Sequence, residues 1–312
     1  MSVSVILVSY NTADLTIRAI ECVFASARNC SFPVDVLVID NASRDDSVAR
    51  VRAEFPTVRL FESPTNLGFG AANNLAIASS DSKYVLLLNT DAFLQPESLT
   101  VLEQFMRGNP LVGVVGPTLL NADGTVQTAA WNFPSPLQSL FEYSGIGNLF
   151  LHVPLIGGYR KWNHNKTQRV PWLIGACILI RRSVFVDIGG FDSAFFMYAE
   201  ETDLQRRIRR AGYDIQLCAD TQVVHVGGGS GTMESESVRR YFYTSQDLYM
   251  RKHFGFHGLV VHRLIFGLCS VARCVAWNAM SFINRKNYRS CKDKAILYAF
   301  TAKRSLTDWS IS

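Results

Sequence analysis

The sequence lacks the short signatures of several common protein classes. It has seven cysteines, an odd number, and no two of them show C-x-x-C spacing, so neither a disulfide framework nor a zinc site is indicated. No G-x-G-x-x-G follows the first apolar run and no G-K-[ST] occurs, which disfavours a dinucleotide-binding enzyme and a P-loop NTPase. The first residues carry no basic stretch and no cleavage site, so we expect no signal peptide. Together these absences favour a reducing compartment, the cytoplasm.

Acidic residues are scarce in one part of the chain only. Residues 251–312 hold 11 Lys and Arg but only two acidic residues, Asp293 and Asp308, whereas the net charge of the whole chain is +5. The basic character therefore belongs to the C-terminal segment. Such a segment suits an anionic membrane surface or nucleic acid, but no nucleic-acid-binding module is recognisable. We expect no nucleic-acid partner.

Short apolar runs alternate with helical segments in the first part of the chain. The runs are rich in β-branched residues and predict strands, and capping residues precede the segments between them. The expected strands are 3–9, 34–40, 58–62 and 84–89, and the expected helices are 14–25, a second ending near 53 and a third ending near 79. This alternation predicts an α/β fold with a parallel sheet. The nearly continuous apolar strands predict helices on both of its faces.

Beyond this region the rhythm changes. We expect a strand over 112–119, a turn at Asp123–Gly124 that leads into another strand, and a buried strand over 172–181. Residues 131–169 are rich in Pro, Gly, Asn and aromatic residues, which predicts a long loop. A helix is expected to begin near Glu200 and to end at Gly212.

Polar residues directly follow three of the expected strands. They are Ser9–Asn11, Asp40–Asn41 and Asn89–Asp91. In an open α/β sheet the ligand crevice lies outside the carboxyl ends of the strands, so these groups should meet at one edge. Asp40 is either a turn or helix cap or an acceptor for a ligand N–H. Asn66 and Gly68 have a similar pair of interpretations, because glycine after asparagine suits both a tight turn and a close approach to a flat ligand.

A second acidic cluster, Glu200, Glu201 and Asp203, follows an aromatic run. It either favours a helix N-terminus or supplies a half-buried general base, whose pKa the apolar surroundings would raise. On a helix Glu200 and Asp203 share a face, while Glu201 points elsewhere. His225 ends a later strand, before a glycine run, and is either a packed core residue or a cation ligand.

Eight segments, in this order, resemble the inverting glycosyltransferases of family 2, and most closely a bacterial rhamnosyltransferase-like branch. They cover about residues 2–253 and read VSVILVSYN, VLVIDNASRDDS, NLGFGAANN, LLLNTDAFL, NADGTVQ, WLIGACILIRR, GGFDSAFFMYAEETDLQRR and VVHVGGGS. The resemblance implies a GT-A fold for residues 1–255, with a mostly parallel, Rossmann-like sheet. It implies transfer of a sugar from a nucleotide-sugar to a hydroxyl of a glycan or lipid-linked acceptor in cell-surface polysaccharide synthesis. The branch suggests dTDP-rhamnose as the donor.

The resemblance also suggests roles for individual residues. It implies that the nucleotide-sugar is surrounded by Ser9, Tyr10, Asn11, Asp40, Asn66, Gly68, Asn89 and Thr90. It implies a divalent cation, Mg²⁺ or Mn²⁺, on Asp91 and His225, where Asp91 is the last residue of the family's D-x-D element. Glu201 stands where the family has its catalytic base. Trp172 and Gly175 stand where the acceptor side begins.

Two positions depart from the family pattern. Asn89, Thr90 and Asp91 replace D-x-D, and Glu201 replaces the Asp of a Glu-Asp pair. Because glutamate is one methylene longer, Glu200 or Asp203 could act as the base instead. The same departures leave open a catalytically inert nucleotide- or glycan-binding relative. A nucleotidyltransferase is a further alternative, although the first loop lacks the glycine and lysine residues typical of such enzymes.

The C-terminal segment, residues 256–312, is the last feature of the sequence. Its apolar stretch 259–283 is interrupted by His262, Arg263, Arg273 and Asn278, which makes it too polar for a transmembrane helix. We expect a basic amphipathic helix on a membrane surface. A helix packed on the catalytic domain and a homodimer contact are the alternatives. A lipid-linked acceptor would keep the protein peripheral, on the inner face of the cytoplasmic membrane.

Overall fold

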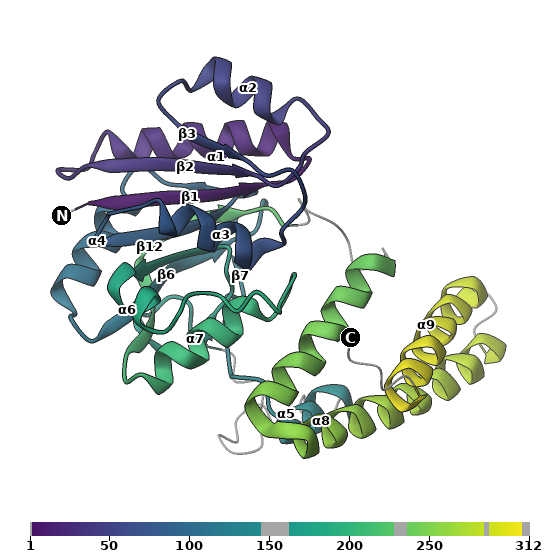
Figure 1. Ribbon diagram of the computed structural model, residues 1–312. Coiled ribbons are helices and arrows are strands. Elements are labelled where there is room, and N and C mark those ends of the chain that lie inside the picture. Colours follow the sequence, from purple (N-terminus) through teal and green to yellow (C-terminus); the bar gives the residue numbers. More distant parts are fainter. Residues whose placement is uncertain (1, 145–161, 228–235, 284–286, 308–312) are drawn as a thin grey trace. The chain divides into compact units, whose positions relative to one another are not determined.

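The computed structural model describes residues 2–144, 162–227, 236–283 and 287–307 (Figure 1). The chain divides into two compact units. The first comprises Met1–Phe133 and Lys161–Ser245, and the second comprises Pro134–Arg160 and Gln246–Ser312. We expected a boundary after residue 255 and a loop over 131–169. The two units of the structure divide inside a long helix, and residues 134–144 of the expected loop region belong to the second unit.

The first unit is built on a ten-stranded sheet of order β3-β2-β1-β4-β11-β6-β12-β5, with β7 added beside β6 and β9 beside β12. A small second sheet pairs β8 with β10. The strands are β1 Val3–Ser9, β2 Val34–Asp40, β3 Arg59–Glu62, β4 Tyr84–Asn89, β5 Ala92–Leu94, β6 Val112–Leu120, β7 Val126–Gln127, β8 Ala130–Trp131, β9 Gln168–Val170, β10 Trp172–Leu173, β11 Cys177–Arg181 and β12 Asp214–His225. Strands β3, β2, β1 and β4 are parallel, as is the β6–β12 pair, and β11 runs antiparallel between them.

Helices cover both faces of this sheet, as the apolar strands predict. The helices of the first unit are α1 Ala13–Ala27, α2 Ser47–Glu54, α3 Phe69–Ala78, α4 Ser98–Gly108, α6 Arg182–Asp187 and α7 Glu200–Arg210. The core on one face is shared with α1, α2 and α4, and the core on the other face with α3, α6 and α7. Leu86 and Leu88 of β4 belong to the first core, while Leu87 points into the second. This alternation is the two-residue period of a strand.

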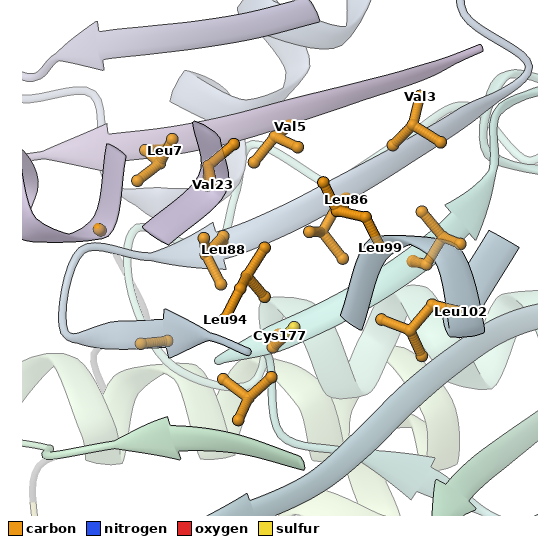
Figure 2. Close-up of a cluster of buried hydrophobic side chains, with 14 of the residues drawn as sticks. Val3, Val5, Leu7, Val23, Leu86, Leu88, Leu94, Leu99, Leu102 and Cys177 are labelled. Carbon is orange, nitrogen blue, oxygen red and sulfur yellow. The ribbon is translucent and has the colours of Figure 1, made fainter. Parts of the chain in front are cut away.

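Figure 2 shows the first core, where Val23 of α1 lies beside the side chains of β1, and Leu99 and Leu102 of α4 belong to the same cluster. Leu86 and Leu88 are at most 1% exposed. Burying a side chain of this size contributes about 1.5–3 kcal/mol relative to leaving it in water. The core therefore holds β1 and β4 rigidly, and with them the polar residues at their carboxyl ends.

Two expectations about local structure are corrected. The expected strand over 172–181 is two strands, β10 and β11, because the chain passes from the small β8–β10 sheet into the main sheet at residues 174–176. The N–H of Ile174 donates to the carbonyl of Ala129, and the carbonyl of Ala176 accepts from the N–H of Asn89. The region expected to be a loop contains helix α5, Pro136–Ser144. Residues 145–161 and 228–235, the latter including two glycines of the run after His225, lie outside the described residues.

The second unit contains α5, most of α8, Glu236–Ile283, and α9, Tyr288–Thr307. Helix α8 is interrupted at Gly255, which has a φ of 70°. A side-chain hydrogen bond of 2.9 Å runs from Nζ of Lys292 on α9 to Oδ1 of Asn278 on α8. In the part of the chain that the structure describes, α8 is also the one helix long and apolar enough, by length and composition, to cross a membrane. From the sequence we expected residues 259–283 to be too polar for a transmembrane helix.

Candidate active site

The carboxyl ends of β1, β2 and β4 meet at one edge of the sheet. In the parallel register Ser9 lies opposite Asp40, and Val8 lies opposite Asn89. Two cavities, both formed within the first unit, include residues of this edge. We call them the acidic cavity and the Asp40 cavity.

The acidic cavity has a volume of about 320 Å³. Its lining combines residues from the end of β4, from the break between β10 and β11, from the start of α7 and from the end of β12. These residues are Val8, Phe69, Asn89, Thr90, Asp91, Ile174, Gly175, Ala176, Met197, Tyr198, Glu200, Glu201 and His225. Seven of the residues singled out in the sequence are thus brought together, although they lie far apart in the chain.

Asp91 and His225 reach the acidic cavity from neighbouring strands. His225 lies opposite Ala92 in the β12–β5 pairing, and the N–H of Val226 donates to the carbonyl of Asp91. Nε2 of His225 therefore lies 3.3 Å from Oδ1 of Asp91. The other ring nitrogen, Nδ1, lies 2.7 Å from Oε1 of Gln127.

Glu200 and Glu201 begin helix α7 and are both withdrawn from solvent. One carboxylate oxygen of each, Oε2, is buried without a hydrogen-bond partner among the described residues. Burial raises the pKa of both carboxyl groups, and the charge of Glu201 raises the pKa of Glu200 further. Backbone N–H groups, including that of Gly175, oppose the rise at Glu201. Two carboxylates that lack full solvation hold a proton more readily than exposed ones, which suits a group that accepts a proton in a reaction.

The chain enters α7 through a strained backbone. Tyr198 and Ala199 have φ values of 69° and 63°, in the left-handed region that residues other than glycine rarely adopt. The start of α8 packs against this segment: the rings of Tyr198 and Phe242 meet edge to face, and the Ser245 hydroxyl donates to the carbonyl of Met197 at 2.7 Å. Strain of this kind costs about 1–3 kcal/mol per residue and persists where the surroundings hold it in place.

Residues 4–189 match the family described as Glycosyl transferase family 2. The chain belongs to this family. An N-acetylglucosaminyl-diphospho-decaprenol L-rhamnosyltransferase of Mycobacterium tuberculosis is 32% identical over 62% of the chain and 66% of the relative. The O-antigen chain rhamnosyltransferase WbaN of Salmonella anatum is 26% identical over 78% of the chain and 71% of that relative. The match therefore spans slightly less than two thirds of the mycobacterial relative.

Among solved structures, the mannosyltransferase PcManGT of Pyrobaculum calidifontis, in complex with GDP-Man and Mn²⁺, has a TM-score of 0.57. The match covers 99% of this chain and 88% of the mannosyltransferase, at 17% sequence identity. This likeness concerns the fold, and it confirms the GT-A fold of the family 2 domain. The resemblance to family 2 and to its rhamnosyltransferase branch is likewise confirmed by the sequence relatives.

Asp203 does not line the acidic cavity of the family 2 domain. Its side chain is fully buried, and Oδ2 accepts a 2.8 Å ion-paired hydrogen bond from Nε of Arg207. The same guanidinium donates to the carbonyls of Ile188 and Gly190. Asp203 therefore helps to anchor the turn before α7. Glu200 and Glu201 both line the cavity, although neighbouring residues do not share a helix face.

The Asp40 cavity has a volume of about 740 Å³. Tyr10, Asp40 and Asn66 are among the residues that line it. Oδ2 of Asp40 accepts from the N–H of Ser43 at 3.0 Å, whereas Oδ1 is buried without a hydrogen-bond partner among the described residues. The side chain thus serves as a turn cap with one oxygen and retains the other as an acceptor. The turn-cap interpretation of Asp40 is confirmed, and its role as an acceptor for a ligand stays a prediction.

Four other predicted site residues line neither cavity. Ser9 is buried, and its hydroxyl bonds to Thr16. Asn11 holds the loop after β2 by accepting from the N–H of Arg44. Gly68 has a φ of 78°, and a Cβ there would lie 2.0 Å from the carbonyl oxygen of Phe196, so its close approach is to the chain itself. Trp172 donates from Nε1 to the carbonyl of Asn132.

Two residues of the site, Gln127 and Tyr198, were not indicated by the sequence, and a third, Asn41, was noted there only as a polar residue after a strand. Gln127 contacts His225, Tyr198 lines the acidic cavity, and Asn41 binds the loop that carries Asn66 by donating to Oδ1 of that side chain. Gln127 was within reach of the sequence reading, because it belongs to the NADGTVQ segment. No sequence pattern indicated Tyr198, because its place in the acidic cavity follows from its backbone conformation.

Proposed function

We propose that this family 2 glycosyltransferase moves a sugar from a nucleotide-diphospho-sugar to an acceptor hydroxyl and inverts the anomeric carbon. The observation that carries the proposal is the acidic cavity, in which buried Glu200 and half-buried Glu201 share one space with the Asp91–His225 pair. A displacement at an anomeric carbon needs a proton acceptor for the incoming hydroxyl and charge compensation for the departing diphosphate. One cavity of the chain offers candidates for both.

The Asp40 cavity is proposed to receive the nucleoside part of the donor. The free oxygen of Asp40 is a buried acceptor of the kind that a base N–H would satisfy, and an unsatisfied buried acceptor is costly when nothing occupies it. Tyr10, 37% exposed, offers a ring face beside it. Rhamnose is the proposed sugar because the names of the mycobacterial and Salmonella relatives specify rhamnosyl transfer.

The residues of the acidic cavity fit a divalent cation. Oδ1 of Asp91 and an unprotonated Nε2 of His225 both present electron pairs, and at 3.3 Å they repel unless a cation or a proton lies with them. No group of three or more His, Cys, Asp or Glu side chains suited to a metal occurs among the described residues. Oxygen atoms of the donor diphosphate are therefore proposed as further ligands, as is common for Mg²⁺. A bound Mg²⁺ or Mn²⁺ would offset negative charge on the leaving diphosphate.

Glu201 is the proposed base. The charge of Glu201 raises the pKa of Glu200, so Glu200 is the member of the pair that keeps a proton more readily. Glu201 lies beside Gly175, where a Cβ added to the glycine would be 3.4 Å from Cβ and Cγ of Glu201. This space next to the glycine is where an acceptor hydroxyl can approach the carboxylate.

The reaction step balances with these groups. The acceptor oxygen forms a bond to the anomeric carbon as the bond from that carbon to the diphosphate oxygen breaks. The electron pair of the broken bond stays on the diphosphate, and the acceptor proton moves to the Glu201 carboxylate. Attack opposite the leaving group inverts the configuration.

A screen of nucleotide-sugars, with and without Mn²⁺, tests the proposed function. Incubation with each donor should release nucleoside diphosphate from one of them in a Mn²⁺-dependent manner, and NMR of the glycoside should show the inverted anomer. Binding of a donor without any turnover would indicate an inert relative. Formation of nucleotide-sugar from a nucleoside triphosphate and a sugar phosphate would indicate a nucleotidyltransferase.

The acceptor is proposed to be lipid-linked, with the second unit held at a membrane surface. The mycobacterial relative is named for a decaprenol-linked substrate. Within the described part of the second unit, the distribution of side chains supports lipid contact, because it is the reverse of that in a water-soluble helical protein. The buried positions of α8 after Gly255 and of α9 are mainly small or polar: Leu259, His262, Arg263, Ser270, Ser281, Cys291, Ala295, Thr301, Ala302 and Ser305.

Large apolar side chains lie on the outside of the same helices. Those at least 36% exposed on α8 after Gly255 and on α9 are Phe256, Val261, Leu264, Leu268, Val271, Val275, Met280, Phe282, Ile283, Tyr288, Ile296, Leu297 and Phe300. Helices that pack in lipid show this pattern: small and polar residues lie between the helices, and large apolar residues lie on the outside. In water such an exposed apolar surface is unfavourable. The basic residues of 256–312 suit an anionic headgroup layer beside it.

A further inference from the structure

The NADGTVQ turn carries a chain of hydrogen bonds that ends on the His225 ring. Oε1 of Gln127 lies 2.7 Å from Nδ1 of His225, and Nε2 of Gln127 donates to Oδ1 of Asn121 at 3.1 Å. Nδ2 of Asn121 donates in turn to Oγ1 of Thr125 at 2.9 Å. The Thr125 hydroxyl donates to Oδ1 of Asp123 at 2.6 Å. Five side chains are thus connected in one series.

The direction of this series is determined at its outer end. An ionised carboxylate can only accept, so the Thr125 hydroxyl must donate to Asp123. The oxygen of Thr125 then accepts from the Asn121 amide, which turns Oδ1 of Asn121 toward Gln127. Oδ1 accepts from the Gln127 amide, and Oε1 of Gln127 is left to face the histidine. A reversal of the two amides would set the Thr125 and Asp123 oxygens against each other as two acceptors.

A carbonyl oxygen at 2.7 Å requires a proton on Nδ1 of His225. In neutral imidazole only one nitrogen carries a proton, so Nε2 then has a free electron pair. That nitrogen is the one 3.3 Å from Asp91 and lining the acidic cavity. In the opposite tautomer Nε2–H would donate to Asp91, and the pair could not hold a cation together.

We propose that Gln127 is a positioning residue, oriented by the Asn121–Thr125–Asp123 turn, which fixes His225 as the Nδ1–H tautomer with Nε2 available to the cation. The inference rests on the proposed function in one respect, the use of Nε2 toward a metal. The tautomer itself can be measured without any metal or substrate. It also gives a physical role to the NADGTVQ segment, which the proposed reaction does not otherwise use.

The test is the tautomer of His225 in the full-length, metal-free chain. Long-range ¹H–¹⁵N correlation spectra of ¹⁵N-histidine-labelled protein distinguish a protonated Nδ1 from a protonated Nε2, and a His225→Asn spectrum assigns the signal among the six histidines. The spectra are recorded at mildly alkaline pH, where imidazole is neutral. The wild type should show the Nδ1–H form. Gln127→Met, which removes the acceptor, should shift the population toward Nε2–H.

Gln127→Glu retains an acceptor at the same place and should restore the Nδ1–H form. Val126→Thr, on the exposed neighbour in β7, is the matched control and should leave the spectrum unchanged. An Nε2–H form in the wild type, or an unchanged tautomer in Gln127→Met, would overturn the inference.

A second measurement separates this inference from the proposed function. With nucleoside diphosphate present, Gln127→Met should weaken Mn²⁺ binding, measured by calorimetry, by about 10–100-fold, the usual effect of losing a partner of a metal-bound histidine. Absence of Mn²⁺ binding in the wild type would contradict the proposed metal role and leave the tautomer result to decide on Gln127. Equal Mn²⁺ affinity in wild type and Gln127→Met would overturn the positioning role even if the tautomer shifts.

Discussion

Nε2 of His225 and Oδ1 of Asp91 lie 3.3 Å apart, although 133 positions separate the residues in the chain and each sits just after or at the end of its own strand. Their meeting depends on the antiparallel pairing of β12 with β5, which continues from the residue after Asp91. Two groups that both offer electron pairs are held together by the sheet itself. The sheet pairing consequently places both groups where a positive charge between them would be stabilised.

Asp91→Asn should abolish the metal-dependent part of donor binding. The substitution keeps the size of the side chain but removes the negative charge. Donor affinity in the presence of Mn²⁺, measured by calorimetry, should fall by more than the roughly 10–100-fold typical of changes beside a metal ligand. The wild-type chain should bind Mn²⁺ weakly alone and well with nucleoside diphosphate. Unchanged donor affinity in Asp91→Asn, or tight Mn²⁺ binding without nucleotide, would contradict the assignment.

Glu201→Gln should retain donor binding and lose about 10²–10⁴-fold in kcat, the usual contribution of a general base. Asp203→Asn is the matched comparison, because it makes the same chemical change two residues away, outside the acidic cavity. It should lower the melting temperature by loosening Arg207 while kcat stays within about tenfold. Steady-state kinetics and thermal unfolding of both variants distinguish the roles. A nearly active Glu201→Gln together with an inactive Asp203→Asn would reverse the assignment.

Glu200→Gln should stabilise the chain at neutral pH. Burial and the charge of Glu201 raise the pKa of Glu200 in the folded state. At pH values between the ordinary carboxyl pKa, about 4.5, and this raised pKa, the folded state therefore binds more protons than the unfolded state. Stability of the wild type therefore falls as pH rises through this window. Glutamine has no proton to lose, so the stability difference should vanish below about pH 4.5.

Unfolding by urea as a function of pH measures this difference. Leu111→Gln, at an exposed site without an ionisable group, is the control, and its stability difference from the wild type should not change with pH. A difference between Glu200→Gln and wild type that stays constant with pH, or grows toward acidic pH, would show that Glu200 is not raised in the folded state.

The sequence was sufficient for those features that depend on local pattern. β1, β2 and β4 have the expected bounds because each is a continuous apolar run between turns, and the parallel order of such runs brings their polar ends to one edge. The gathering of Asp91, Glu201 and His225 in one cavity was expected from the resemblance to family 2. It was not derivable from spacing, because it depends on the register between β5 and β12.

Long-range contacts account for what the sequence did not reveal. Gly68 looked like a point of ligand approach, and the carbonyl that approaches it comes from Phe196, which no local pattern could indicate. Asp203 shares its composition with Glu200 and Glu201, and only the position of Arg207 relative to the turn at Gly190 shows its different role. The apolar run 172–181 looks like one strand in the sequence. The structure breaks it at Gly175, because Ile174 bonds to Ala129, beside β8, whereas Ala176 bonds to Asn89 of β4.

Removal of large apolar side chains from the outside of α8 should release the chain from membranes. Leu268 and Val275 are 62% and 63% exposed, so Leu268→Gln with Val275→Gln removes apolar surface without changing charge or the packed side of the helix. If both side chains enter lipid, each contributes up to about 1.5–3 kcal/mol, and binding to anionic vesicles should fall at least about tenfold. Ala272→Gln with Ala276→Gln is the matched control, since it adds the same amides nearby but removes no large side chain. Co-sedimentation should be retained in the control. If the first pair of substitutions leaves vesicle binding intact and instead shifts the mass of the particle in solution, the apolar face belongs to a homodimer contact and the membrane proposal is wrong.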